Sequence, residues 1–278
     1  MSTTTADLSA DPGLRAAEEA HHRKMRRLAW RRRLLPVAGI GGFIGLWAFI
    51  VWFWEVPRFV APSPQLVLAT LFERWDVLLA NLVPTAIEAF AGFTLGNLAA
   101  IAVATVFVHR KTAEEAFFPV VVLINTIPVV AKAPILVLLM GNGMEPKIAI
   151  AALICFFPTL VNMVRGLESV NPQAMELMRV LSASEREIFF KLRLRNALPY
   201  LFSALKIAAS TAVIGAIVGE WIGSTYGIGA LIIQSMYNFD SPMLYATVIV
   251  GSAFSVLFFA VIVAAERYFI RWQPANNA

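Results

Sequence analysis

Six apolar runs recur along the sequence, and they constrain its fold more than any other feature. A helix needs about 20 apolar residues to span the hydrocarbon core of a bilayer. Apolar residues make up 59% of the chain and charged residues only 15%, which excludes a disordered chain and an ordinary water-soluble globule. The pattern predicts an all-α, polytopic membrane protein with six transmembrane helices, at residues 34–54, 84–108, 116–140, 148–164, 197–219 and 243–265.

The basic residues between these runs predict the orientation. With the N-terminus inside, the cytoplasmic segments carry 18 Lys and Arg residues, and the outer segments carry only Arg58, Arg74 and Lys147. Lys and Arg concentrate on the cytoplasmic side of membrane proteins, so we expect both termini to be cytoplasmic. The predicted parts are a basic tail at 1–33, a six-span domain at 34–272 and a C-terminal tail at 273–278.

The basic tail and the first outer loop have expected roles of their own. The basic residues before the first span are expected to meet anionic membrane lipid, and no motif accompanies them that would indicate nucleic-acid binding. In the outer loop, apolar residues from Val67 through Trp75 to Leu82 recur on one helical face. This spacing predicts a short helix on the outer surface.

The predicted cytoplasmic loop at 165–196 has the pattern of two helices separated by a sharp turn. Asn171 followed by Pro172 is typical of a helix start. Ser182-Ala183-Ser184 interrupts that helix, and Ser184 with Glu187 forms a capping box for a second one. The second helix is expected to end near Leu198-Pro199, where the fifth span begins.

Motifs of enzymes and metal sites are missing from the sequence. No lysine follows a glycine, so the chain lacks the Gly-Lys-Ser/Thr element of a phosphate-binding loop. His21, His22 and His109 have no Cys or carboxylate cluster around them, and the single Cys155 excludes an intrachain disulfide. We therefore expect a protein that is not an enzyme and that holds no metal or cofactor.

The loop resembles the coupling loop, known as the EAA loop, of permease subunits of binding-protein-dependent ABC importers. Glu176 holds the Glu position of that motif, Ser182 the Gly position, and Leu192 and Leu194 the two apolar positions. Leu177 and Met178 replace its alanines, and Arg195 replaces its proline. The segments 61–64, 127–134, 156–158 and 226–234 are similar to the nitrate/sulfonate/taurine branch of that family.

The resemblance implies a permease of the bacterial inner membrane that works as a dimer, expected to be a homodimer. Two cytosolic ATPase subunits would bind ATP and Mg²⁺, and a periplasmic or lipid-anchored binding protein would deliver the solute. The residues expected to couple to the ATPase are Glu176, Arg179, Leu181, Ser182, Ala183, Ser184, Arg186, Leu192 and Leu194.

The sequence leaves more than one possibility for the solute and for the transport mechanism. The branch favours a small anion such as a sulfonate, nitrate or carboxylate, while a pyrimidine or vitamin-like solute is the alternative. A channel or secondary transporter that needs no ATPase, and a membrane anchor for other subunits, are the rival classes. A channel or secondary transporter would give the long cytoplasmic loop no purpose, while in a membrane anchor the loop would serve assembly.

Polar residues within the spans are candidates for the pathway, because a charge in hydrocarbon is costly unless it faces a cavity or a partner. Lys132 either favours anionic solutes in the pathway or forms an ion pair with Glu88. Asn125 lines the pathway or bonds between helices, and Glu220 gates it or caps a helix at the outer face. Glycines every four residues favour close helix packing, at Gly215, Gly219 and Gly223.

Overall fold

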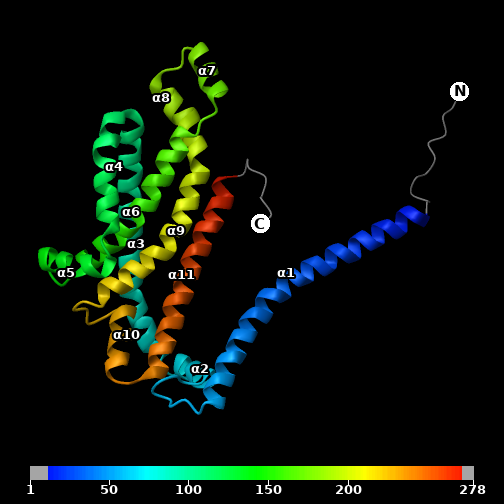
Figure 1. Ribbon diagram of the computed structural model, residues 1–278, viewed down its shortest axis with the longest axis vertical. Helices are drawn as coiled ribbons and strands as arrows, with labels where there is room; N and C mark the ends of the chain where they lie inside the picture. The colour runs from blue at the N-terminus through cyan, green and yellow to red at the C-terminus, as the bar shows by residue number, and fades with distance from the viewer. Residues whose placement is uncertain (1–11, 271–278) are drawn as a thin grey trace. The chain divides into compact units, whose positions relative to one another are not determined.

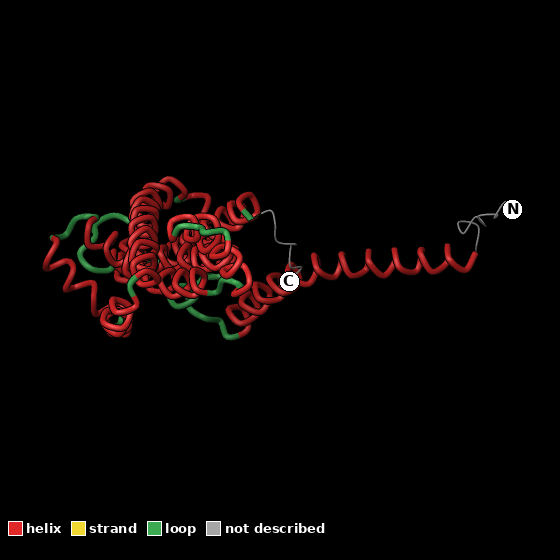
Figure 2. The backbone as a smooth tube through the Cα atoms, turned by 90° about the horizontal axis from the view of Figure 1, so that it is seen from above, coloured by secondary structure: helices red, strands yellow, loops and turns green. Residues whose placement is uncertain are grey.

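The computed structural model describes residues 12–270, and every regular element within that range is helical (Figure 2). The all-α expectation is confirmed for this part of the chain. The chain divides into two compact units, residues 1–66 and residues 67–278. The predicted C-terminal tail at 273–278 and the first 11 residues lie outside the described range.

The first unit contains one long helix, α1 (Pro12–Phe53). The first predicted span is the apolar second half of this helix, and the predicted basic tail from residue 12 onward continues it in the other direction. In the apolar part of α1, Leu34–Phe53, no residue of the most apolar stretch is buried against the rest of the chain. A helix that is apolar all round and exposed in this way suits a lipid environment.

The second unit is a helical bundle built around α6 (Glu145–Glu168), which packs between α3 (Trp75–His109) and α9 (Leu194–Glu220) (Figure 1). Alanines make up half of the buried residues in the two core clusters, among them Ala89, Ala100 and Ala104 of α3 and Ala208, Ala209 and Ala212 of α9. Small side chains let helix backbones approach closely. The helix α11 (Ser241–Phe269) packs on α9 through Phe258 and its neighbours.

Glycines make the closest of these approaches possible. A Cβ added at Gly92 or Gly96 of α3 would overlap the backbone of α6 near Ala152. Gly215 and Gly219 of α9 also come close to α6, near Ala151 and Lys147. At both glycines the close neighbour is α6 of the same chain. Gly223 lies beyond the end of α9, in a turn with φ +71°.

The predicted third span at 116–140 is wrong as a single continuous helix. The chain forms α4 (Lys111–Thr126) and α5 (Val129–Met140), which are bent by 100° relative to each other. Pro128 has no N–H to continue α4, and a residue before proline disfavours helical backbone, so Ile127 is extended with ψ 125°. The described residues thus contain five helices long enough to cross a membrane, or six if this pair counts as one span.

Other predicted boundaries shift as well. The short helix α2 (Pro64–Glu73) ends before Trp75, so Trp75 to Leu82 belong to α3 and not to a separate surface helix. The second loop helix does not end at Pro199, because α9 continues through that proline. Lys147 lies in α6, not in an outer loop. A further short helix that the sequence did not indicate, α10 (Ile228–Tyr237), precedes α11.

The contact between α3 and α6 gives the first prediction, for the variant Gly96→Ala. The added methyl group would meet the Ala152 carbonyl, so we expect a loss of about 1–3 kcal/mol in stability and a fall of several degrees in the unfolding midpoint. The buried thiol of Cys155 is a natural reporter, because a thiol-reactive dye reaches it on unfolding. Gly42→Ala is the matched control, because nothing lies within 4 Å of a Cβ there. Equal midpoints for the two variants would contradict this packing.

Candidate functional site

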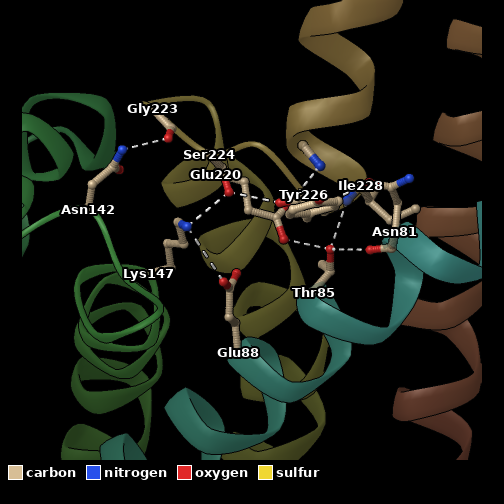
Figure 3. A network of polar contacts seen from close by, with 12 residues as sticks. Asn81, Thr85, Glu88, Asn142, Lys147, Glu220, Gly223, Ser224, Tyr226 and Ile228 are labelled. Atoms are coloured by element: carbon tan, nitrogen blue, oxygen red, sulfur yellow. Dashed lines mark hydrogen bonds and ion pairs between the residues drawn. The ribbon is translucent and has the colours of Figure 1, made fainter.

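Two features of the second unit combine polar or exposed side chains in a way that packing alone does not require. The first is an elbow at one end of the bundle, made of α7 (Pro172–Val180), α8 (Glu185–Glu187) and the π-helix η2 (Ile188–Arg193) (Figure 1). The second is a buried polar cluster at the α10 end, drawn in Figure 3.

Local side-chain bonds shape the elbow as its sequence predicts. The Asn171 side chain accepts a hydrogen bond from the Gln173 N–H at the start of α7. Ser184 accepts from the Glu187 N–H, and the Glu187 carboxylate accepts from the Ser184 N–H at 3.1 Å. Both predicted caps are therefore present. They satisfy backbone donors that the first turn of a helix leaves unpaired.

The turn at Ser182 requires an uncommon backbone conformation. Ser182 has φ +53°, and its N–H donates to the Arg179 carbonyl while the Ala183 N–H donates to the Met178 carbonyl. This pair of bonds closes a helix with a left-handed residue, the position where glycine is most common. Serine holds the turn here through the backbone, since no bond of its hydroxyl occurs within the described residues.

The tip of the elbow exposes apolar side chains next to charged ones. Leu177 is 58% exposed, Val180 80% and Leu181 67%. Glu176, Arg179 and Arg186 are also exposed, and Arg186 lies 5.9 Å from the centre of the Phe190 ring. Leu192 and Leu194, by contrast, are partly buried toward the base of the elbow. The tip of the elbow therefore presents both exposed apolar side chains and exposed charged side chains.

The base of the elbow ties α6 to α9. Asn196 donates to the Gly166 carbonyl and to the Ser169 hydroxyl, both at 3.0 Å. A Cβ at Gly166 would come within about 3 Å of Ala197, so the two helices touch at this point. The Phe189 ring packs on His109 at the end of α3, with ring centres 5.1 Å apart. The elbow therefore contacts α6 and α9 through η2, and α3 through Phe189.

The buried cluster starts from the turn before α10. Three successive backbone N–H groups, of Gly227, Ile228 and Gly229, donate to Asn81, Thr85 and Glu220 respectively. A helix start leaves such donors without partners inside the helix, and a carboxylate there is favoured by the helix dipole. Side chains from α3 and α9 therefore cap α10 (Figure 3).

Glycine is required twice in this turn. Gly227 has φ +120°, and a Cβ there would overlap the Glu220 carboxylate. A Cβ at Gly229 would overlap the Ile217 carbonyl of α9. The Gly-Ile-Gly segment is thus explained by the close approach of a backbone to a carboxylate and to a neighbouring helix.

Two carboxylates and one ammonium group lie side by side in the cluster. Glu88 and Glu220 are each 1% exposed, and Lys147 lies 3.9 Å from Glu88 while donating to the Ser224 hydroxyl at 2.9 Å. Glu220 also accepts from the Thr85 hydroxyl at 2.6 Å. The second oxygen of Glu88 is buried, and no donor reaches it among the described residues. Charge is therefore only partly compensated here.

The candidate pathway residues separate into two places. Glu88 pairs with Lys147, not with Lys132, so the ion pair considered from the sequence does not form. Lys132 and Asn125 instead line a small cavity between α4, α5 and α6. Lys147, Asn81 and Thr85 were missed by the sequence analysis, since a position within or beside an apolar run does not say which distant residues meet there.

Similarity to known proteins agrees with these features. Residues 92–273 match the family described as "Binding-protein-dependent transport system inner membrane component". The chain is 34% identical over 227 residues to the formylaminopyrimidine transport permease protein ThiX of Halalkalibacterium halodurans, covering 79% of this chain and 91% of the relative. It is 26% identical over 250 residues to the putative aliphatic sulfonates transport permease protein SsuC of Bacillus subtilis, covering 89% and 90%.

A solved structure shares the fold. A chain of the inward-facing MetNI methionine ABC transporter superposes with a TM-score of 0.61 at 18% identity, over 72% of this chain and 97% of that chain. The family match covers the elbow, the C-terminal part of α3, and the helices α6, α9 and α11, and it begins after Asn81, Thr85 and Glu88 of the buried cluster. The chain therefore belongs to the binding-protein-dependent transport system inner membrane components, and it is a permease component of an ABC importer.

Proposed function

We propose that two identical copies of this chain form the translocation pathway of an ATP-driven importer in a bacterial inner membrane. Each copy seats its elbow in a cytosolic ATPase subunit, which binds ATP and Mg²⁺, while a periplasmic or lipid-anchored protein delivers the solute. This chain performs no chemistry of its own and needs no cofactor. The exposed apolar tip of the elbow is the observation that carries the proposal, since Val180 and Leu181 are 80% and 67% exposed.

The elbow has the properties of a docking surface. It is short, capped at both helix starts and closed by a backbone turn, so little order has to be gained on binding. Its tip combines exposed leucine and valine side chains with Arg179 and Arg186, and a core of apolar residues with a charged rim is typical of protein interfaces. Glu176 makes no ion pair among the described residues and is free to meet a basic group of the ATPase.

The two rival classes fit these features less well. A channel or secondary transporter without an ATPase would gain nothing from an exposed apolar elbow outside the bilayer. A mere membrane anchor would need no link from the elbow into the bundle, yet η2 of the elbow packs on α6 and α9, and its Phe189 packs on His109 of α3. ATP-driven movement of the elbow would change the packing of α6 and α9, and so change access to the pathway.

The buried cluster is proposed to hold α10 against α3 and α9. Glu88 and Glu220 are each 1% exposed, so in this conformation they position backbone and do not line an open path. Because Lys147 and Glu220 lie at the ends of α6 and α9 far from the elbow, the cluster and the elbow are linked by the same two helices. The cluster therefore holds α6 and α9 in place at one end, while the ends next to the elbow move.

The solute has two candidates. A small anion such as a sulfonate, nitrate or carboxylate is favoured by Lys132 and by the relative named for aliphatic sulfonates. A pyrimidine-type solute is favoured by the 34% identical relative named for formylaminopyrimidine. Competition between the two classes in an uptake assay with the complete importer separates them.

The docking role predicts the effect of Val180→Asp. A charge at this exposed apolar position should not affect the fold, but it would have to be desolvated in the ATPase cleft, so we expect at least about a tenfold loss of ATPase affinity. Co-purification from native membranes with quantitative mass spectrometry measures it. Thr112→Asp is the control, because Thr112 is exposed near the same end of the bundle but outside the elbow. Undiminished ATPase in the Val180→Asp preparation would contradict the docking role.

The cluster predicts an asymmetry between two carboxylates. Glu220→Gln weakens charge-assisted bonds to Thr85 and to the Gly229 N–H, which should cost about 1 kcal/mol or more. Glu88→Gln places an amide where an oxygen has no donor, so we expect little loss or a gain in stability. The Cys155 thiol assay compares the two midpoints. The cluster is misassigned if Glu88→Gln is the more destabilising change.

A further inference from the structure

Lys132 is the exception among the described lysine side chains. Lys111, Lys147, Lys191 and Lys206 each form an ion pair with a glutamate, at 2.8–3.9 Å. Lys132 forms none within the described part of the chain, and it has no hydrogen bond to its side chain there. It is nevertheless only 9% exposed. A buried cation without a partner is costly in a membrane protein and points to a binding role.

The surroundings of Lys132 form a small cavity that is apolar apart from two groups. Its volume is about 70 Å³, and it lies between α4, α5 and α6. Apolar side chains make most of the wall, at Val121, Ile124, Leu153, Phe156 and Phe157. The two polar residues of the lining are Lys132 and Asn125, and no residue with a carboxylate lines the cavity. Asn125 is exposed, so the cavity has an accessible side.

The backbone adds to the positive charge. Lys132 lies in the first turn of α5, which begins at Val129 directly after the bend at Pro128. A helix N-terminus carries partial positive charge, so a lysine there is unfavourable unless an anion is near. α5 has no acidic residue in its first turn. The Lys132 side chain and the positive end of the α5 dipole thus lie close together at the bend, and no acidic residue in the first turn of α5 offsets them.

We propose that Lys132 and Asn125 form a binding site for a small oxyanion group, such as a sulfonate, carboxylate, nitrate or phosphate. An ammonium and an amide N–H₂ can both donate to the oxygens of such a group, and charge-assisted bonds of this kind are strong where water is scarce. The inference rests on the proposed transport function, because it makes an anionic group of the solute one occupant. The phosphate of a lipid headgroup has the same chemistry and is the other source.

The first experiment uses the complete importer in phosphatidylcholine nanodiscs and follows unfolding by the exposure of Cys155. Nitrate, methanesulfonate, acetate and phosphate are compared with chloride at equal ionic strength. A ligand that binds the folded state raises the midpoint, and we expect at least one oxyanion to raise it saturably, by about 2 °C or more. Lys132→Gln should abolish the rise, Lys132→Arg should keep it, and Asn125→Ala should weaken it several-fold.

A control removes a partly buried ion pair elsewhere. Lys206 and Glu266 lie 2.9 Å apart, and the double variant K206Q/E266Q removes both charges without leaving one unpaired. Its oxyanion response should equal that of the unaltered protein. If Lys132→Gln folds poorly, Lys132→Met removes the same charge with a side chain of similar length and gives the same test.

The second experiment distinguishes the lipid source. Nanodiscs containing phosphatidylglycerol are used, and lipid retained by the protein is counted by native mass spectrometry. Retention that is lost in Lys132→Gln, without a response to soluble anions, assigns the site to a lipid phosphate. Responses and lipid retention that are both unchanged in Lys132→Gln would overturn the proposal.

The oxyanion site and the importer function can fail separately. Val180→Asp should release the ATPase and keep the oxyanion response, while Lys132→Gln should lose the response and keep the ATPase. An absent response, together with lipid retention that is unchanged in Lys132→Gln, would remove the site alone if the protein still holds its ATPase. A response in a protein that never binds an ATPase would remove the proposed function and leave the site.

Discussion

The close packing of α6 against α3 and α9 is the constraint on which the rest of the structure depends. Glycines and alanines on α3 and α9 bring their backbones into direct contact with α6. In a bilayer, where helices gain little from burying apolar surface against one another, such contact is the main source of stability. It also sets the geometry, because α6 is about 36 Å long at 1.5 Å per residue and carries a functional feature at each end.

The two ends of α6 differ in how polar and apolar groups are arranged. At one end the chain leaves the bundle as a capped elbow whose apolar tip has no partner within the described residues. At the other end, Lys147 of α6 and Glu220 of α9 lie in a buried network that caps α10. One helix pair therefore links a surface suited to a partner protein with a rigid polar joint. The proposed function uses this arrangement to carry a movement of the elbow along the pair.

Local signals in the sequence predicted local structure well. The helix start at Asn171 and the capping box at Ser184 involve residues two or three positions apart, so the sequence alone contains both partners. The apolar runs predicted the long helices, because each run lies within one continuous stretch of sequence. The 100° bend at Pro128 was missed, because hydropathy reports that a run is apolar but not whether it is straight.

Long-range partners could not be predicted in this way. Glu88 meets Lys147 across the contact between α3 and α6, and Lys206 meets Glu266 across the contact between α9 and α11. Gly223 continues the four-residue spacing of Gly215 and Gly219, yet it falls in a turn because α9 ends at Glu220. The packing of the helices determines which glutamate pairs with which lysine. That packing depends on small residues, and the sequence does not indicate which residues they contact.

Cross-linking from the tip of the elbow tests the central claim most directly. Cys155 is buried and is the only cysteine, so Leu181→Cys provides one accessible thiol on the elbow. A photoreactive cross-linker attached there in native membranes, followed by mass spectrometry, identifies whatever seats on the tip. The account predicts a cross-link to a protein with an ATP-binding phosphate loop. Cross-links to lipid alone, from membranes in which the importer is active, would contradict it.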